Sequence, residues 1–556
     1  MLCLATAAFG RSNISQDAGR GGKTAVRRAN FFCQLRHVAL AAVYPYPRHA
    51  SGSSMPTLLE SFLASARHRD SGEPALSWTA VLLVLLAIAT RLQILGDPLA
   101  DSDEGYYLLV GEHLLHGAVP YVDIWDRKPV GLFLLYAGMR WLGGDGVIAY
   151  QLAGTLAAFL TALLVMRLAR QFTNAFGAAA AGAAYVLWLP LGSAAGGQAE
   201  LFANLPITAA ALITLRGLEQ PSAVRCRTGG MSALLLVGIA MQIKYTALFA
   251  GIFLGCCWLV AGWRVGWRAG LVAFGAMLNV AALAPTLLAI AWYAAHGHLD
   301  AFLYANFTSA WQRAVPSILH QSGALVIALI LAPLLACIRP RAVLPAAGRI
   351  AYRFTLGWLL AATVGLIAYR TYLQQFLLPL LMPASAAAAP TFGRIPARRT
   401  VALLGVILVL GQCDLWISRI VHGSRREAAA IVRAVDPQGC LYIYSGVAAL
   451  YRLTGACIPT KYAFPSLLSR TRESGAIGVD PVREVARIMG TRPGTVLVRS
   501  AYEDENWRAR AVVEDVLRHA YHLVLREQLG QWTVSVYRLG NASRDRSRGV
   551  RPDSGS

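Results

Sequence analysis

Long apolar segments, separated by short polar ones, fill the chain between residues 78 and 420. A helix of about 20 apolar residues crosses the hydrocarbon core of a bilayer, so such segments indicate membrane spans. Over the 556 residues, 56% are hydrophobic and only 14% are charged, whereas a soluble domain is about 25% charged. The sequence therefore excludes a soluble, fibrous or disordered protein and predicts an α-helical multi-pass membrane protein. We expect about eleven spans, at residues 78–95, 147–170, 175–192, 199–216, 229–243, 245–262, 268–292, 321–338, 351–369, 373–391 and 400–419.

Arginines mark every second loop between the expected spans, while the alternate loops hold most of the acids. Cytoplasmic loops of membrane proteins carry an excess of Lys and Arg. The pattern predicts a cytoplasmic N-terminus and places the loop 96–146 and the C-terminal domain outside. It also explains the net charge of +22 without a nucleic-acid partner, and the Ala- and Arg-rich composition indicates a bacterial plasma (inner) membrane. The arginines concerned are Arg167, Arg170, Arg216, Arg225, Arg227, Arg264, Arg268, Arg339, Arg341, Arg349, Arg394, Arg398 and Arg399.

The N-terminal segment 1–54 differs from the rest of the chain. It is Arg-rich, and its only apolar run, His37–Val43, is too short to span a bilayer. We expect either a disordered extension or a mis-annotated one, with translation starting at Met55. A functional or targeting tail is the alternative.

The segment 425–540 changes character again and predicts a small extracytoplasmic α/β domain after the membrane domain 78–420. Patterns typical of strands occur at 439–445, 495–499 and 531–538, and helical patterns at 482–489 and 508–518. The polar residues 541–556 are expected to be a disordered tail. In an oxidising compartment a disulfide between Cys440 and Cys457 is plausible, and two small buried residues are the alternative.

The loop 96–146 concentrates charge beside one membrane face. A carboxylate can take the proton of a hydroxyl, and Lys or Arg can neutralise a departing phosphate. Together they suit the transfer of a group from a lipid-linked phosphate. The alternative is that Asp103 and Glu104 merely cap a helix that begins at Gly105, since acids favour helix N-termini. The loop contains, among its charged residues, Asp101, Asp103, Glu104, Glu112, Asp123, Asp126, Arg127 and Lys128.

Four motifs in and after this loop carry a family resemblance. They resemble the first extracytoplasmic loop of GT-C glycosyltransferases, closest to the bacterial branch related to protein O-mannosyltransferases and the lipid A aminoarabinose transferase (family 39). The resemblance covers roughly 80–420 and is strongest across 101–155. The motifs are Asp103-Glu104-Gly-Tyr-Tyr, Gly117-x-x-Pro-Tyr-x-Asp, Asp126-Arg-Lys-Pro and Tyr150-Gln151.

The resemblance implies roles for residues of the loop. In this family the acid pair holds the catalytic Asp, which is Asp103 here, with Glu104 beside it as the second catalytic candidate. Lys128, in the Lys-Pro motif, would lie by the donor phosphate. The usual Lys-Pro-Pro is Lys-Pro-Val in this chain, which puts membership of the best-studied subfamilies in doubt.

Polar residues near other expected outer ends extend the candidate site. Glu200 starts a span where the family often has an acid, and Lys244 resembles the basic residue that contacts the lipid phosphate. Arg370 is a third candidate for phosphate binding. The alternatives are a helix N-terminal acid for Glu200, snorkelling for Lys244 and interfacial anchoring for Arg370. The candidate substrate-binding residues are Tyr106, Asp126, Glu200, Asn204 and Tyr372.

A metal site is not expected from the sequence. His296, His298 and Asp300 lie close together after one span, but a His-x-His-x-Asp spacing alone is a weak signal. The cofactor therefore stays unknown, because some GT-C enzymes use a divalent ion and others do not.

Together these features predict an inverting membrane glycosyltransferase that uses a polyprenyl-phosphate sugar donor on the extracytoplasmic side. The acceptor would be a hydroxyl of a lipid, glycan or protein. A transporter or lipid flippase is the first alternative, although transporters place polar residues near the midplane and are often built from repeats. A non-catalytic assembly protein is the second.

Overall fold

The computed structural model describes residues 75–314, 322–339, 344, 348–370 and 372–540. The expectations for 1–54 and 541–556 lie outside these residues. The elements below belong to one compact unit, apart from residues 113–118 at the end of α5, which group separately.

Each expected span corresponds to a helix, which confirms the α-helical multi-pass membrane fold. Eight helices of the described chain are long and apolar enough to cross a membrane, whereas α4, α8 and α15 are shorter there. A 3₁₀ turn, η6 (Gln374–Leu377), leads into α17. The span helices are α4 (Ala75–Ala89), α7 (Val147–Ala169), α8 (Ala175–Trp188), α9 (Ala199–Glu219), α10 (Ala223–Met241), α11 (Ala247–Arg264), α12 (Leu271–Ala295), α15 (Ser322–Ala336), α16 (Arg349–Tyr369), α17 (Leu378–Phe392) and α18 (Ala397–His422).

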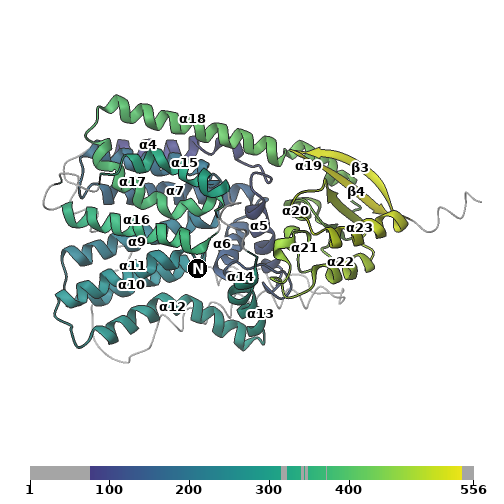
Figure 1. Ribbon diagram of the computed structural model, residues 1–556, viewed down its shortest axis with the longest axis horizontal. Coiled ribbons are helices and arrows are strands. Elements are labelled where there is room, and N and C mark those ends of the chain that lie inside the picture. Colours follow the sequence, from purple (N-terminus) through teal and green to yellow (C-terminus); the bar gives the residue numbers. More distant parts are fainter. Residues whose placement is uncertain (1–74, 315–321, 340–343, 345–347, 371, 541–556) are drawn as a thin grey trace, which may run out of the picture. The chain divides into compact units, whose positions relative to one another are not determined.

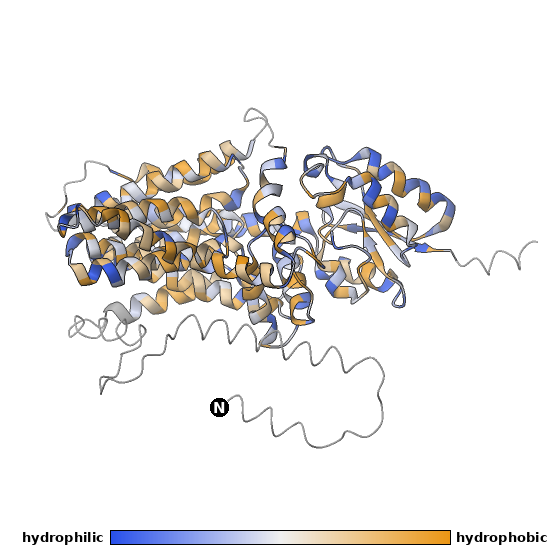
Figure 2. Cartoon of the chain, turned by 90° about the horizontal axis from the view of Figure 1, so that it is seen from below, coloured by the Kyte–Doolittle hydropathy of each residue, from blue (hydrophilic) through white to orange (hydrophobic). Residues whose placement is uncertain are grey.

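Small residues allow these helices to pack closely, as is usual in membranes. A side chain at Gly238 of α10 would meet the Ala282 carbonyl oxygen of α12 at 2.3 Å. Helix α10 also packs against α9, α11 and α12, and the last two lie on either side of it in Figure 1. Helix α8 lies against α7 and α17. The outward faces carry large exposed apolar side chains, such as Val272 and Leu360, which suit contact with lipid tails. Figure 2 shows the long helices as predominantly hydrophobic.

Short helices occupy the polar segments next to the span helices. The loop after α4 folds into α5 (Ser102–Leu115) and α6 (Val130–Trp141). After α12 come α13 (Leu299–Leu303), the π-helical turn η3 (Tyr304–Thr308) and α14 (Ser309–Gln312). These elements supply most of the candidate site.

The C-terminal part is a small α/β domain with a four-stranded sheet of order β1-β2-β4-β3, parallel between β1 and β2 and antiparallel elsewhere. Cys440 and Cys457 form a disulfide with a Cα–Cα distance of 4.5 Å, so the expected bond is confirmed. Hydrophilic residues are more frequent in this domain than in the long helices (Figure 2). Strand β3 was not predicted. The elements are α19 (Arg425–Ala434), β1 (Leu441–Ile443), α20 (Ala449–Thr454), α21 (Ser466–Ser469), η7 (Thr471–Glu473), α22 (Pro481–Gly490), β2 (Thr495–Arg499), α23 (Trp507–Ala520), β3 (Tyr521–Leu529) and β4 (Trp532–Leu539).

Candidate active site

A cavity of about 430 Å³ collects charged side chains from segments far apart in the sequence, and we call it the charged cavity. Its walls come from the start of α5, the link between α10 and α11, the η3–α14 segment, the region before α17 and the C-terminal domain. The polar residues lining it are Asp101, Ser102, Asp103, Asp126, Arg127, Lys128, Lys244, Tyr245, Asn306, Arg313, Tyr369, Gln375, His422, Ser466, Arg470, Arg472 and Glu473.

The first turn of α5 presents Asp103 to this cavity. Helix α5 begins at Ser102, not at Gly105, and Asp101 is its cap. The Asp101 Oδ1 atom accepts hydrogen bonds from the backbone N–H of Asp103 at 2.8 Å and of Glu104 at 3.2 Å. The capping role considered for the acid pair thus belongs to Asp101, while the Asp103 carboxylate accepts a long hydrogen bond from the Tyr107 hydroxyl at 3.4 Å.

Glu104 points away from the charged cavity, although it is adjacent to Asp103 in the sequence. Its side chain is buried against Gly196, where an added Cβ would lie 2.0 Å from a Glu104 carboxylate oxygen. Burial and the charge of Asp101 raise the pKa of Glu104 well above its ordinary value. Desolvation and the charge of Asp103 likewise raise the pKa of Asp101, to about 7. Burial therefore favours the protonated forms of Asp101 and Glu104, as their raised pKa values show.

Two lysines of the predicted set reach the same cavity from different elements. The Lys128 Nζ atom lies 5.2 Å from the centre of the Tyr107 ring, a cation–π contact. The Lys244 Nζ atom lies 2.7 Å from a Glu200 carboxylate oxygen, and both side chains are almost fully buried. Glu200 itself lines a narrow, mostly apolar cavity between α9, α11, α16 and α17, which shares Phe376 with the charged cavity.

The other predicted site residues divide into two groups. Asp126 lines the charged cavity, and its Oδ1 atom accepts a hydrogen bond from the backbone N–H of Arg127 at 2.6 Å. Tyr106 is buried, and its hydroxyl donates to the Trp125 carbonyl oxygen at 2.7 Å. The Asn204 side-chain amide donates to the Tyr185 hydroxyl and to the Leu378 carbonyl oxygen inside the helix bundle. The charged cavity is not lined by Arg370 or by Tyr372. Arg370 is exposed and follows the end of α16 with φ +53°. Their expected roles stay predictions.

Sequence reasoning missed a second group of charges in this cavity, centred on Glu473. The Glu473 carboxylate of η7 lies 2.7 Å from Arg127 and 2.9 Å from Arg313. Burial opposes its ionisation, but the two guanidinium groups hold the pKa of Glu473 below its ordinary value. Arg470 and Arg472 flank it. No periodicity or motif connects these segments, and the only available signal was the surplus of arginine in a domain expected to lie outside.

Neutral polar side chains complete the cavity. Tyr245 and Asn306 line it, and the Tyr245 hydroxyl donates to the Asn306 side-chain oxygen at 2.6 Å. Tyr121 does not line the cavity, but its hydroxyl donates to the carbonyl oxygen of the lining residue Lys128 at 2.7 Å. Among the described residues no cluster of three His, Cys, Asp or Glu side chains is placed to hold a metal ion. His296 instead stacks on Trp292.

Comparisons with known proteins bear on the fold. No family model and no curated protein matches the chain. The structure of ArnT from Cupriavidus metallidurans bound to undecaprenyl phosphate superposes with a TM-score of 0.57 at 16% identity, over 82% of this chain and 97% of ArnT. The archaeal oligosaccharyltransferase AglB from Archaeoglobus fulgidus gives a TM-score of 0.45 at 10% identity, over 85% and 74% of the two chains.

The mycobacterial arabinofuranosyltransferase AftD gives a TM-score of 0.42 at 14% identity, over 84% of this chain and 42% of AftD. The ArnT comparison carries the assignment, since it spans the membrane helices and nearly the whole of the other chain. The chain therefore has the fold of the GT-C membrane glycosyltransferases.

Proposed function

We propose that the protein is an inverting membrane glycosyltransferase that moves a sugar from a polyprenyl-phosphate donor to a hydroxyl of a lipid, glycan or protein. One observation carries the proposal: the Asp103 carboxylate and the Lys128 and Lys244 ammonium groups line a single cavity beside the membrane helices. A base and a phosphate-binding pair are what such a transfer requires.

In the proposed reaction the acceptor hydroxyl attacks the anomeric carbon of the donor sugar. Asp103 takes the hydroxyl proton, and a new bond forms between the acceptor oxygen and the anomeric carbon. The bond between that carbon and the phosphate oxygen breaks on the opposite face, which inverts the configuration. Its electron pair leaves with the polyprenyl phosphate, whose negative charge Lys128 and Lys244 stabilise.

The fold supports a lipid-linked donor. ArnT, which shares the fold, was solved with undecaprenyl phosphate bound. A transporter is less well supported, because transporters bind their substrates near the midplane of the bilayer. In this chain the cavity's charged residues come from the loops next to the spans and from the C-terminal domain, rather than from the middle of the helices.

Transfer of a labelled sugar from a synthetic polyprenyl-phosphate donor tests the proposal. Asp103→Asn keeps the size of the side chain but removes the base, so transfer should fall roughly 10²–10⁴-fold while the protein still inserts and folds. Asp123→Asn is the matched control, because Asp123 is an exposed acid of the same loop outside the cavity. Near-normal transfer by Asp103→Asn, or movement of intact donor across vesicles without transfer, would reject the proposed chemistry.

The proposed site also needs the charged cavity to lie on the extracytoplasmic side of a bacterial inner membrane. The arginine-rich alternate loops support this orientation. A phosphatase reporter fused after residue 425 should then be active. A reporter active only in the cytoplasm would put Asp103 on the wrong side of the membrane.

A further inference from the structure

A second cavity, of about 740 Å³, lies in the C-terminal domain, and we call it the Trp507 cavity. Its volume falls in the range of roughly 300–1,000 Å³ that is usual for sites of small ligands. The α22 and α23 N-termini and the segment between α21 and α22 form its walls. The lining residues with polar or aromatic groups are Thr471, Ser474, Asp480, Glu505, Asn506, Trp507 and Arg508.

Trp507 is the unusual residue of this cavity. Its side chain belongs to a domain with its own buried core, yet the residue is 57% exposed. The Arg510 guanidinium lies 5.8 Å from the indole centre, a cation–π contact that supports the ring. Exposed tryptophans that line a cavity are typical of binding sites, because the ring offers a large rigid surface at little entropic cost.

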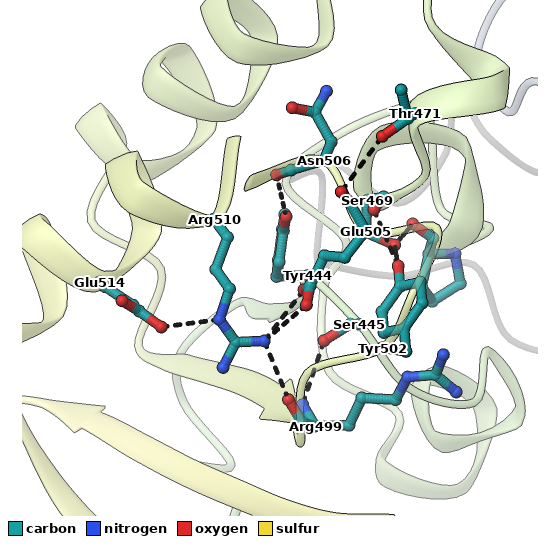
Figure 3. A network of polar contacts seen from close by, with 11 residues as sticks. Tyr444, Ser445, Ser469, Thr471, Arg499, Tyr502, Glu505, Asn506, Arg510 and Glu514 are labelled. Atoms are coloured by element: carbon teal, nitrogen blue, oxygen red, sulfur yellow. Dashed lines mark hydrogen bonds and ion pairs between the residues drawn. The ribbon is translucent and has the colours of Figure 1, made fainter. Parts of the chain in front are cut away.

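A hydrogen-bond network holds Glu505 and Asn506 (Figure 3), the two residues directly before Trp507 in the chain. The Asn506 N–H donates to the Ser469 carbonyl oxygen at 2.8 Å, and the Tyr444 hydroxyl donates to the Asn506 carbonyl oxygen at 3.1 Å. The buried Glu505 carboxylate is paired with Arg510 at 2.9 Å. The segment before α23 is thus fixed before any ligand arrives, which lowers the entropic cost of binding.

The Trp507 cavity and the charged cavity share a wall. Arg470, Arg472 and Glu473 line the charged cavity. Thr471 and Ser474, which alternate with them along the same turn, line the Trp507 cavity. The η7 segment therefore contributes to the walls of both cavities.

We propose that the Trp507 cavity binds the glycan part of the acceptor, with a sugar ring stacked on the Trp507 indole. The inference rests on the proposed transferase function and narrows its acceptor class to a carbohydrate. Sugar rings have an apolar C–H face that packs on an indole, and hydroxyl groups that need both donors and acceptors. Asp480 and Arg508 supply both, and their opposite charges suit a neutral glycan.

Equilibrium binding to the detergent-solubilised full-length protein tests the inference. The probes are fluorescent tetra- to hexasaccharides of mannose, galactose and arabinose, measured separately from undecaprenyl phosphate. Trp507→Ala should weaken the binding of whichever oligosaccharide the wild-type protein binds, roughly tenfold or more. Trp507→Phe, which keeps an aromatic ring, should weaken it less. Trp311→Ala, which removes an 89% exposed tryptophan outside both cavities, is the matched control and should bind as the wild type does.

The outcomes separate the inference from the function beneath it. Oligosaccharide binding that Trp507→Ala weakens and Trp311→Ala does not would support the acceptor site. Binding of none of the three probes, or equal binding by Trp507→Ala, would overturn it, provided that undecaprenyl phosphate still binds. Loss of undecaprenyl phosphate binding in the wild type would instead count against the transferase function itself.

Discussion

The Arg127 guanidinium lies 2.7 Å from the Glu473 carboxylate and joins the loop that carries the candidate site to the η7 turn of the C-terminal domain. The Arg313 guanidinium lies 2.9 Å from the same carboxylate, so Glu473 forms ion pairs with two arginines. The Glu473 side chain is only 5% exposed. Removing one member of a buried charge group leaves the others uncompensated, and this is more costly than losing a surface pair.

Glu473→Gln should therefore loosen the shared wall of the two cavities. Breaking a buried pair costs about 3–5 kcal/mol, whereas Asp515→Asn, in an exposed pair with Arg518, should cost at most about 1 kcal/mol. Hydrogen exchange of η7 and of the segment 119–129 measures the effect, and both should exchange faster in Glu473→Gln only. Equal hydrogen-exchange protection of η7 and 119–129 in the two variants would mean that the Glu473 ion pairs do not stabilise this wall.

The buried pair of Lys244 and Glu200 allows stability to be separated from donor binding. Lys244→Met or Glu200→Gln alone leaves one buried charge unpaired and should destabilise the protein, by about 3–5 kcal/mol. The double variant removes both charges and should recover most of that loss, as a double-mutant cycle in denaturant measures.

Donor binding should follow a different order in the same variants. If Lys244 contacts the donor phosphate, undecaprenyl phosphate binds more weakly to Lys244→Met and to the double variant, but not to Glu200→Gln. Affinity that tracks stability across all three variants would show that the pair is purely structural.

Hydropathy predicted the helical architecture because the thickness of the bilayer imposes long apolar segments on the sequence. The same local rules found β1, β2, β4 and two helices of the C-terminal domain. They missed β3, which follows α23 directly at Tyr521 without a turn signal and has an exposed stretch at His522–Val524 instead of a regular alternation. An edge strand of this kind leaves little pattern in the sequence.

The candidate site was only partly predictable for a related reason. Asp103, Lys128 and Lys244 belong to local motifs or sit between apolar segments, so each could be recognised by itself. Glu473 reaches Arg127 across more than three hundred residues, and such tertiary pairs have no local signature. Arg370 was expected at the site, but it ends α16 in a left-handed conformation and lies exposed outside the cavity.

The raised pKa of Asp101 predicts a pH-dependent stability. An Asp of the unfolded chain titrates near pH 4, while desolvation and the Asp103 charge raise the folded-state pKa of Asp101 to about 7. The folded protein therefore binds the extra proton between these values. The contribution of Asp101 to the free energy of unfolding is therefore fully present below pH 4. It falls as the pH rises from 4 to 7 and is lost above pH 7.

Asp101→Asn removes the ionisation and keeps the helix cap, because Asn caps a helix about as well as Asp. In the wild type the Gln198 side-chain N–H donates to the Asp101 Oδ2 atom at 2.9 Å. Where Asn places an N–H instead, the Gln198 side-chain oxygen, which has no hydrogen-bond partner among the described residues, can accept it once the Gln198 amide turns over. The variant should unfold at about the wild-type temperature near pH 5 and at a higher temperature near pH 8. Asp123→Asn, at an exposed position of the same loop, should show no such change with pH. A difference between Asp101→Asn and the wild type that stays constant from pH 5 to 8 would mean that Asp101 is already ionised at no cost in the folded protein.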